Sequence, residues 1–239
     1  MCNEEKFPAA HIMKLPFTIE QFLGVFELYN QSVWPFQIFI YIPAVLCIFF
    51  IFRNSRLSGK LISAILVFLW LWMGVIYHLT FFTTINPAAY VFGILFITQA
   101  VLLAYYGLLK GTLSFAFEGS VSAYAGIAMV AFALIVYPLA GYFFGHIYPR
   151  SPTFGLPCPT TIFTLGILLM LKGRIPFRLL IVPILWSLVG FMAALQLGIY
   201  EDTGLLISGI TALICTILRN NSFQKIRSDR VHQPERNNK

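Results

Sequence analysis

Seven apolar segments, separated by short polar stretches, follow one another along most of the chain. A membrane-spanning helix needs about 20 predominantly apolar residues. The pattern therefore predicts an all-α fold, a polytopic transmembrane bundle of about seven spans. The approximate limits of the segments are Trp34–Phe52, Leu61–His78, Pro87–Leu109, Val121–Phe144, Pro159–Leu171, Ile175–Gln196 and Gly204–Leu218.

The fifth segment leaves an alternative open. Residues 159–171 are short for a span and reach the necessary length only if the helix begins near Phe154. In the six-span alternative, this segment enters the bundle and returns to the same face.

An amphipathic segment precedes the first apolar segment. Thr18 and Gln21 have the spacing of a capping box, in which a hydroxyl and an amide satisfy the free backbone groups at a helix start. We expect a helix over about residues 18–31 that lies in the membrane interface. Its apolar face would carry Ile19, Phe22, Phe26 and Tyr29.

The composition agrees with a membrane protein. The chain has 59% hydrophobic and 10% charged residues and a mean hydropathy of +0.81, whereas soluble domains carry about 25% charged residues. The net charge of +7 lies in short loops and at the C-terminus, where it acts on topology rather than on nucleic acid. Residues 1–30 lack the apolar core of a cleaved signal peptide.

The charges also predict an orientation. With seven spans and the N-terminus outside, 13 of the 16 Lys and Arg residues lie on the inner face, and six of the nine acidic residues lie on the outer face. The positive-inside rule favours this arrangement. The chain then divides into an extracytoplasmic segment (residues 1–32), a transmembrane domain (33–218) and a basic cytoplasmic tail (219–239).

The tail mixes Lys, Arg, Asn, Gln and Ser with little apolar content, so we expect it to be disordered. Its basic residues are of the kind that contact anionic lipid headgroups, at about 1 kcal/mol each near the surface. Beyond the lipid bilayer itself, the sequence indicates no particular protein partner.

The outer face holds the chemically interesting residues. Asn86-Pro87 has the pattern of a helix start, with Asn86 as the N-cap. Four prolines between positions 149 and 159 predict a rigid loop that folds over or into the outer mouth of the bundle. Pro159 would begin the next helix, and Cys158 would sit at its N-terminus, where the helix dipole favours a thiolate.

This predicted cluster provides a candidate ligand-binding site. Its residues are His78, Asn86, His146, Tyr148 and Cys158. Imidazole and thiolate groups bind metal ions, so His78, His146 and Cys158 form a metal-site hypothesis, although no two of them share a metal-binding spacing. Glu201-Asp202 lies on the same face, where an acidic pair between two helices is usually a solvated turn.

Several other sites are disfavoured. Haem ligation would need both histidines aimed at one plane, for which the sequence gives no sign, and the chain has too few histidines for a multi-histidine hydrolase site. No P-loop, GxSxG or GxGxxG motif is present. The last apolar segment contains no lysine, so a retinal-type Schiff base there is excluded.

Polar side chains within the predicted spans are few. The conspicuous ones are Gln37, Gln99 and Gln196, with Glu118 at the inner edge of the fourth span. Glutamines in membranes usually join helices by hydrogen bonds. Glu118 is either a functional carboxylate or the polar first turn of its helix. Small residues, including Gly126, suggest that the fourth span is the centre of the bundle.

Several strings carry a family resemblance. Tyr77-His78, Ile85-Asn86-Pro87-Ala88-Ala89-Tyr90, Gly145-His146-Ile147-Tyr148-Pro149, and Pro157-Cys158-Pro159-Thr160-Thr161 resemble a family of uncharacterised bacterial multi-pass membrane proteins. The resemblance covers most of the chain except the first dozen residues and the tail. It implies a bacterial inner membrane, and it implies no activity, substrate or catalytic residue.

Three hypotheses about function follow. The first is transport or binding of a small solute or ion at the outer mouth. The second is an accessory or sensor subunit of a membrane complex. The third is a membrane-embedded enzyme that uses metal or thiol chemistry, which the shortage of catalytic residue types disfavours.

Overall fold

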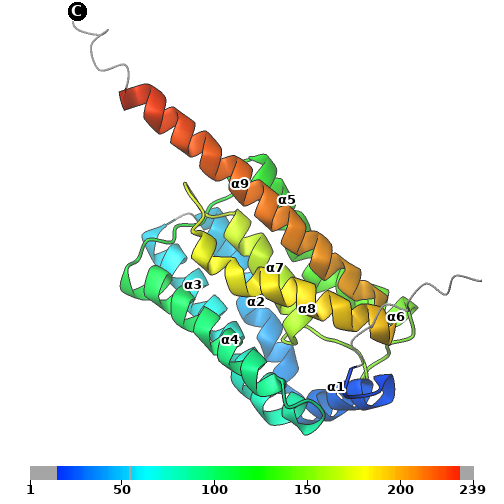
Figure 1. The fold of residues 1–239 in the computed structure, drawn as a ribbon. Helices are drawn as coiled ribbons and strands as arrows, with labels where there is room; N and C mark the ends of the chain where they lie inside the picture. Colours follow the sequence, from blue (N-terminus) through cyan, green and yellow to red (C-terminus); the bar gives the residue numbers. More distant parts are fainter. Residues whose placement is uncertain (1–14, 54, 232–239) are drawn as a thin grey trace, which may run out of the picture.

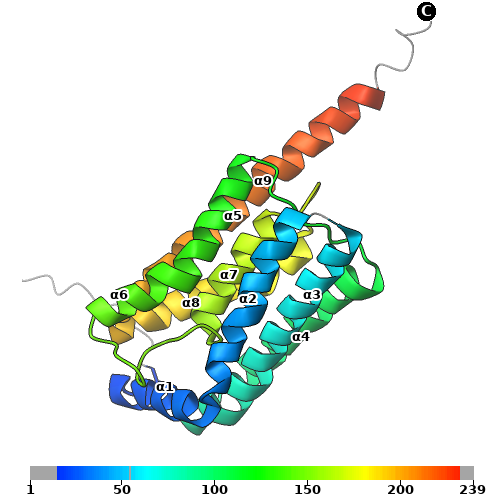
Figure 2. The same ribbon diagram turned by 180° about the vertical axis from the view of Figure 1, so that it is seen from behind.

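The computed structural model describes residues 15–53 and 55–231, which form a bundle of helices joined by loops (Figures 1 and 2). Six helical stretches are long and apolar enough to cross a membrane by length and composition. The predicted all-helical membrane fold is therefore confirmed at this level. These stretches are Phe36–Arg53, Arg56–Thr84, Ala89–Leu109, Val121–Phe143, Phe177–Leu197 and Tyr200–Lys225.

Several of the long stretches combine α-helix with short π-helical or 3-10 segments. A π-helix widens the turn and shifts the side chains that follow, which the apolar pattern does not reveal. The elements are α1 (Ile19–Val33), α2 (Phe36–Arg53), α3 (Arg56–Leu71), η1 (Trp72–Phe81), η2 (Phe82–Thr84), α4 (Ala89–Leu103), η3 (Ala104–Leu109), α5 (Val121–Ala131), η4 (Phe132–Val136), α6 (Tyr137–Phe143), α7 (Pro157–Leu169), η5 (Phe177–Leu179), α8 (Ile181–Leu197), η6 (Tyr200–Asp202) and α9 (Thr203–Val231).

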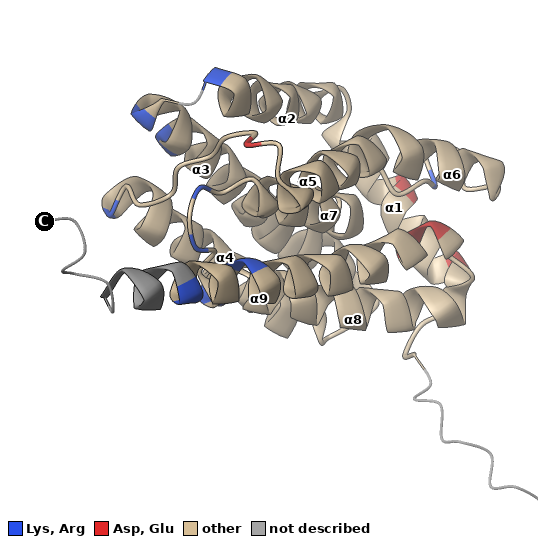
Figure 3. Cartoon of the chain, turned by 90° about the horizontal axis from the view of Figure 1, so that it is seen from above, with Lys and Arg blue, Asp and Glu red and all other residues tan. Residues whose placement is uncertain are grey.

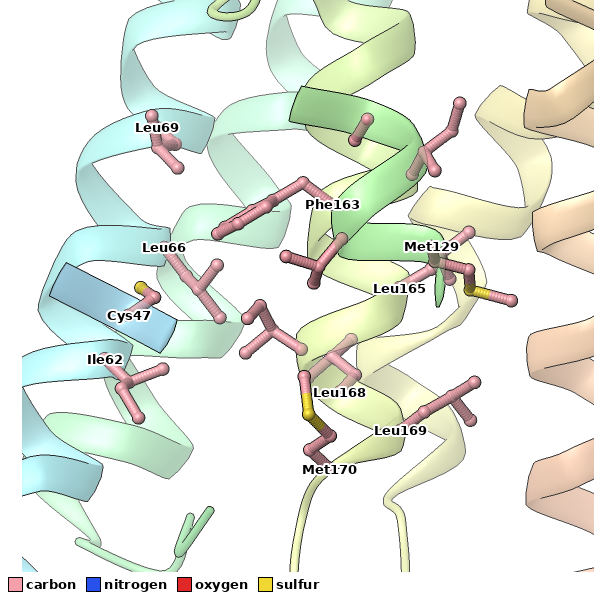
Figure 4. Close-up of a cluster of buried hydrophobic side chains, with 14 of the residues drawn as sticks. Cys47, Ile62, Leu66, Leu69, Met129, Phe163, Leu165, Leu168, Leu169 and Met170 are labelled. Atoms are coloured by element: carbon pink, nitrogen blue, oxygen red, sulfur yellow. The ribbon is translucent and has the colours of Figure 1, made fainter. Parts of the chain in front are cut away.

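Helix α7, the predicted fifth segment, is the centre of the bundle. Twelve of its 13 residues are buried, and its side chains pack between those of α3 and α5 (Figure 4). A helix that is apolar on all sides fits such a position. The expectation that the fourth apolar segment is the centre was wrong, because α5 is half exposed and packs against one side of α7.

The path into α7 explains its short length. Residues 144–156 leave the end of α6 beside α1 and descend into the bundle as a loop. At the other end of α7, Lys172 N donates to Ser114 O (2.8 Å) and Ala116 N donates to Met170 O (3.0 Å), which ties α7 to the loop between α4 and α5. Loop and helix together therefore run from one end of the bundle to the other.

Two glycines allow α5 and α7 to cross closely. A Cβ atom added at Gly126 would lie 2.5 Å from Gly166 O, and one added at Gly166 would lie 2.6 Å from Gly126 O. Neither position has room for a side chain. The predicted role of Gly126 in close helix approach is thus confirmed, with α7 as the partner.

Helix α1 lies across one end of the bundle (Figure 1). Both hydrogen bonds of its capping box are formed, with Thr18 as the N-cap and Gln21 as its partner. The buried face of α1 includes Phe26 and Tyr29, as the amphipathic pattern predicts, whereas Ile19 is exposed.

The start of α4 differs slightly from the prediction. The helix begins at Ala89 rather than at Pro87. Asn86 still acts as a cap for the preceding turn, because its Oδ1 accepts a hydrogen bond from Ala88 N (3.0 Å). The helix start is shifted by two residues, which is within the ordinary uncertainty of helix ends.

The C-terminal part of the chain differs more. Helix α9 continues to Val231 and projects beyond the bundle, whereas the sequence analysis expects disorder from residue 219. Arg219 donates to Leu169 O and Leu171 O, so the first residue of the expected tail is bonded to the core. Residues 1–14 and 232–239, which include parts of both predicted terminal segments, lie outside the described residues.

Charges separate along the bundle (Figure 3). Most described Lys and Arg residues lie at the end from which α9 projects, and most described Asp and Glu residues lie at the end where α1 lies. Glu118 is an exception. It lies in the loop before Ser120, the N-cap of α5, and its Oε2 is 3.7 Å from Arg219 Nη2. Its interpretation as an intramembrane residue is therefore corrected.

Candidate functional site

The proline-rich loop is held against α1 by buried hydrogen bonds. Asn30 is fully buried and its Nδ2 donates to Pro149 O (2.6 Å) and Ser151 O (2.9 Å). Its Oδ1 accepts from Gln37 Nε2 (2.8 Å) and Thr153 Oγ1 (3.0 Å). One side chain thus joins α1, α2 and the loop, and we call this group the Asn30 clamp. The loop enters the bundle as its prolines predict.

A second contact lies deeper. Trp72 Nε1 donates to Tyr29 Oη (2.8 Å), and Tyr29 Oη donates to Gly155 O (3.5 Å). Burial raises the pKa of Tyr29, so its phenol stays neutral and able to donate. On the surface, Arg150 Nη2 lies 2.6 Å from Glu20 Oε2, and this hydrogen bond raises the pKa of Arg150.

Between α1, the 152–159 segment, α4 and α8 the structure has a cavity of about 740 Å³. The lining includes residues of α8 and residues before and within α1. Most of the lining is apolar and much of it aromatic. The aromatic residues are Phe17, Phe22, Phe26, Tyr77, Phe82, Phe92 and Trp186.

Polar groups interrupt this lining in one corner. Cys158, in the first turn of α7, lies next to Asp202. Trp186 also lines the cavity, and its Nε1 is buried without a hydrogen-bond partner among the described residues. Both the Cys158 thiol and the Trp186 indole lie beside Gly190 of α8, within 3.7 Å of where its Cβ would be. The corner therefore offers a ligand an N–H donor, a thiol and a carboxyl group.

The acidic pair at the start of α9 is buried. Glu201 and Asp202 are 3% and 4% exposed. Glu201 Oε1 lies 2.7 Å from His146 Nδ1, and Asp202 Oδ1 accepts a hydrogen bond from Tyr137 Oη. The interpretation of this pair as a solvated turn was wrong, because His146 and Tyr137 reach it from α6 and the loop that follows. The sequence did contain one sign of this burial, because the acidic pair lies in a very short connection between two apolar segments.

A comparison with protein families identifies this chain. The family of unknown function DUF6064 matches residues 19–228. The chain belongs to the DUF6064 family. No curated protein and no solved structure matches it. The match agrees with the resemblance of the sequence to an uncharacterised family, and it assigns no activity.

His78 of the DUF6064 chain lies outside the cavity lining. It is fully buried, and both of its ring nitrogens lack a hydrogen-bond partner among the described residues. Aromatic rings surround it, with ring centroids of Phe96 and Trp186 at 4.5 and 5.1 Å. The side chain therefore packs behind the cavity wall.

The other predicted site residues have separate roles. Asn86 lines the cavity. His146 pairs with Glu201. Tyr148 is half exposed, packs against Trp34 and donates to Asn30 O (3.5 Å). Of the five residues, only Asn86 and Cys158 line the same cavity.

The structure does not bring the residues of the metal-site hypothesis together in the described part of the chain. Within the described part of the DUF6064 chain, no group of three or more His, Cys, Asp and Glu residues could hold a metal ion. His78, His146 and Cys158 are engaged with different neighbours, namely aromatic rings, Glu201 and the cavity corner.

The three glutamines differ in role. Gln37 belongs to the Asn30 clamp. Gln99 Nε2 donates to Leu179 O (2.8 Å) and so joins α4 to the start of α8. Both glutamines thus join separate segments of the bundle by hydrogen bonds. Gln196 is exposed on α8 and lies at the cavity lining.

Proposed function

We propose that this DUF6064 protein is an integral membrane protein that binds an apolar or amphipathic small molecule in the cavity beneath α1. The observation that carries the proposal is the cavity itself, about 740 Å³ with an aromatic lining and one polar corner. Ligand pockets typically measure about 300–1,000 Å³, are mostly apolar, and hold a few polar groups that orient the ligand.

The chemistry of the lining indicates whether the ligand is an apolar solute or an ion. An ion that leaves water needs several oxygen or nitrogen ligands to replace its hydration shell, whereas apolar and aromatic side chains dominate this wall. An apolar molecule gains about 25 cal/mol per Å² of surface removed from water. A solute with an apolar body is therefore the ligand that this cavity suits best.

The charge distribution supports an extracytoplasmic location for the cavity. The cavity lies at the end of the bundle with α1, Glu201 and Asp202, and most described Lys and Arg residues lie at the opposite end (Figure 3). Under the positive-inside rule the basic end faces the cytoplasm. We propose seven membrane crossings on this basis, with the 144–156 loop and α7 together forming the fifth.

The position of α8 also supports entry of the ligand into the cavity from the bilayer. Leu188, Val189 and Met192 of α8 line the cavity and are at the same time exposed on the surface of the bundle. An apolar ligand dissolved in the outer leaflet could reach the cavity beside these residues. Binding is the first step of transport or sensing, and the proposal concerns that step.

The test uses photolabelling of the detergent-purified protein with a diazirine-bearing decanol. We expect saturable labelling of α8 and of residues 152–159, which unlabelled decanol suppresses. Ala193→Phe, which adds a ring at the cavity lining, should abolish the saturable component. Leu195→Phe is the matched control, because Leu195 is exposed on the same helix and does not line the cavity.

Labelling that rises in proportion to probe concentration and is unchanged in Ala193→Phe would contradict the proposal. Such labelling would reflect partition of decanol onto the apolar surface. That outcome would favour the accessory-subunit hypothesis, which needs no binding site of its own. Thiol chemistry at Cys158 would in turn require that a thiol reagent reach this residue and abolish a measurable turnover.

A further inference from the structure

Asp202 is a buried carboxyl group in the wall of an apolar cavity. It is 4% exposed and lines the cavity beside Cys158. Its hydrogen-bond donors are the Tyr137 hydroxyl and the Cys158 thiol, and neither carries a positive charge. A carboxylate removed from water is costly unless an opposite charge or several hydrogen bonds compensate. Asp202 therefore lacks a positively charged partner among the described residues.

The basic side chains that the structure describes at this end, Arg150 and His146, have other partners. Arg150 contacts Glu20 and Glu27 on the surface, and His146 contacts Glu201. Among the residues that the structure describes, Asp202 forms no ion pair. A positive charge beside Asp202 could then come from a ligand.

The rest of the lining also suits a cation. Trp186 lines the cavity together with several phenylalanines. The faces of aromatic rings attract ammonium groups, with tryptophan the most effective, and the attraction grows when water is excluded. The same rings accommodate an apolar chain. An ammonium group on an apolar body satisfies both features of the wall.

We propose that the ligand of this cavity is an amphiphile with a primary amine, whose ammonium group lies against the Asp202 carboxylate and whose apolar part lies along the aromatic lining. This inference rests on the proposed function, because it specifies the ligand of the same cavity. The amine comes either from a free alkylamine-like molecule or from the ethanolamine headgroup of a membrane lipid. Both present the same chemistry to Asp202.

The test compares competitors of equal chain length against the photoreactive decanol. On the wild-type protein, decylamine should compete at roughly tenfold lower concentration than decanol, as expected for one charge-assisted hydrogen bond. Asp202→Asn should remove this preference, so that decylamine and decanol compete at about the same concentration. Glu201→Gln is the matched control, because Glu201 is paired with His146, and it should keep the preference.

A second arm identifies the source of the amine. The protein is placed in nanodiscs of phosphatidylglycerol, with or without phosphatidylethanolamine. A loss of decanol labelling on adding phosphatidylethanolamine would support a lipid headgroup. Competition by decylamine without an effect of this lipid would support a free amine.

The wild-type comparison decides the inference even if Asp202→Asn fails to fold. Equal competition by decylamine and decanol, or a preference that survives in Asp202→Asn, would overturn the amine inference and leave the apolar cavity proposal intact. An absence of any saturable decanol binding would instead overturn both.

Discussion

Two regions of the bundle are built from similar apolar helices and are filled in opposite ways. Around α7, close packing leaves no room for a side chain where Gly126 and Gly166 cross. Beneath α1, a space of about 740 Å³ remains between α1, the 152–159 segment, α4 and α8. Buried charged groups are found near the second region, where Glu201 and Asp202 lie.

The packed region around α7 serves the stability of the fold, whereas the cavity beneath α1 serves binding. Close packing maximises dispersion contacts, and a void forfeits them. A cavity with a buried carboxyl group at its edge has no advantage for stability, so its presence calls for another explanation. The contrast predicts that substitutions around α7 chiefly affect stability and that substitutions in the cavity chiefly affect binding.

The largest expected effect is at the α5–α7 crossing. Gly126→Ala places a methyl group against Gly166 O, where a Cβ would lie at 2.5 Å. We expect a loss of about 3 kcal/mol in the free energy of unfolding, typical of overpacking. Thermal unfolding in detergent would measure it.

Gly24→Ala is the matched control for this substitution. No atom lies within 4 Å of the added methyl group, and alanine favours a helix by up to about 1 kcal/mol over glycine. The control should therefore be neutral or stabilising. Equal destabilisation by the two substitutions would contradict close packing at the crossing.

An intermediate effect is expected at the Asn30 clamp. Asn30→Ala removes four hydrogen bonds. Pro149 O and Ser151 O of the loop lose their donor, whereas Gln37 keeps its hydrogen bond to Thr153. The expected cost is about 2 kcal/mol, because each buried unsatisfied group costs about 1–3 kcal/mol and local relaxation recovers part of it. Proteolysis of the 144–156 loop should accelerate in parallel.

Gln31→Ala serves as the neighbouring control, since the Gln31 side chain is exposed and makes one long hydrogen bond to Glu27 (3.5 Å). It should leave both readouts at the wild-type value. If Asn30→Ala also left the free energy of unfolding and the rate of proteolysis unchanged, the prolines alone would fix the position of the loop.

The smallest effect is expected at Arg150. Its ion pairs with Glu20 and Glu27 are exposed, and exposed pairs contribute little because water and salt screen them. Arg150→Gln should leave the melting temperature unchanged. A clear loss at low salt that disappears at high salt would mean that surface charge rather than the buried Asn30 clamp holds the loop.

Part of this fold was predictable from local pattern. Apolar runs of span length, the capping box at Thr18 and the turn at Asn86 are local signals, and each is found in the structure. The central position of α7 was not predictable, because an apolar helix buried in protein and one facing lipid have the same composition.

The site was harder to predict because its contacts join distant residues. His146 meets Glu201 across 55 positions, and Tyr137 meets Asp202 across 65. Nothing in the local sequence links these pairs. Residue type and position on the outer face predict a site at His78 and Tyr148. Their actual surroundings depend on the direction in which the π-helical segment η1 and the loop turn these side chains.

The central claim is that the space beneath α1 holds an apolar ligand, and fluorescence quenching by a brominated decanol tests it most directly. Bromine quenches tryptophan only at short range, and Trp186 lines the cavity. We expect a saturable quenching component that is present in the wild type and in Trp34→Phe and absent in Trp186→Phe. Quenching that rises linearly in all three proteins would contradict the claim.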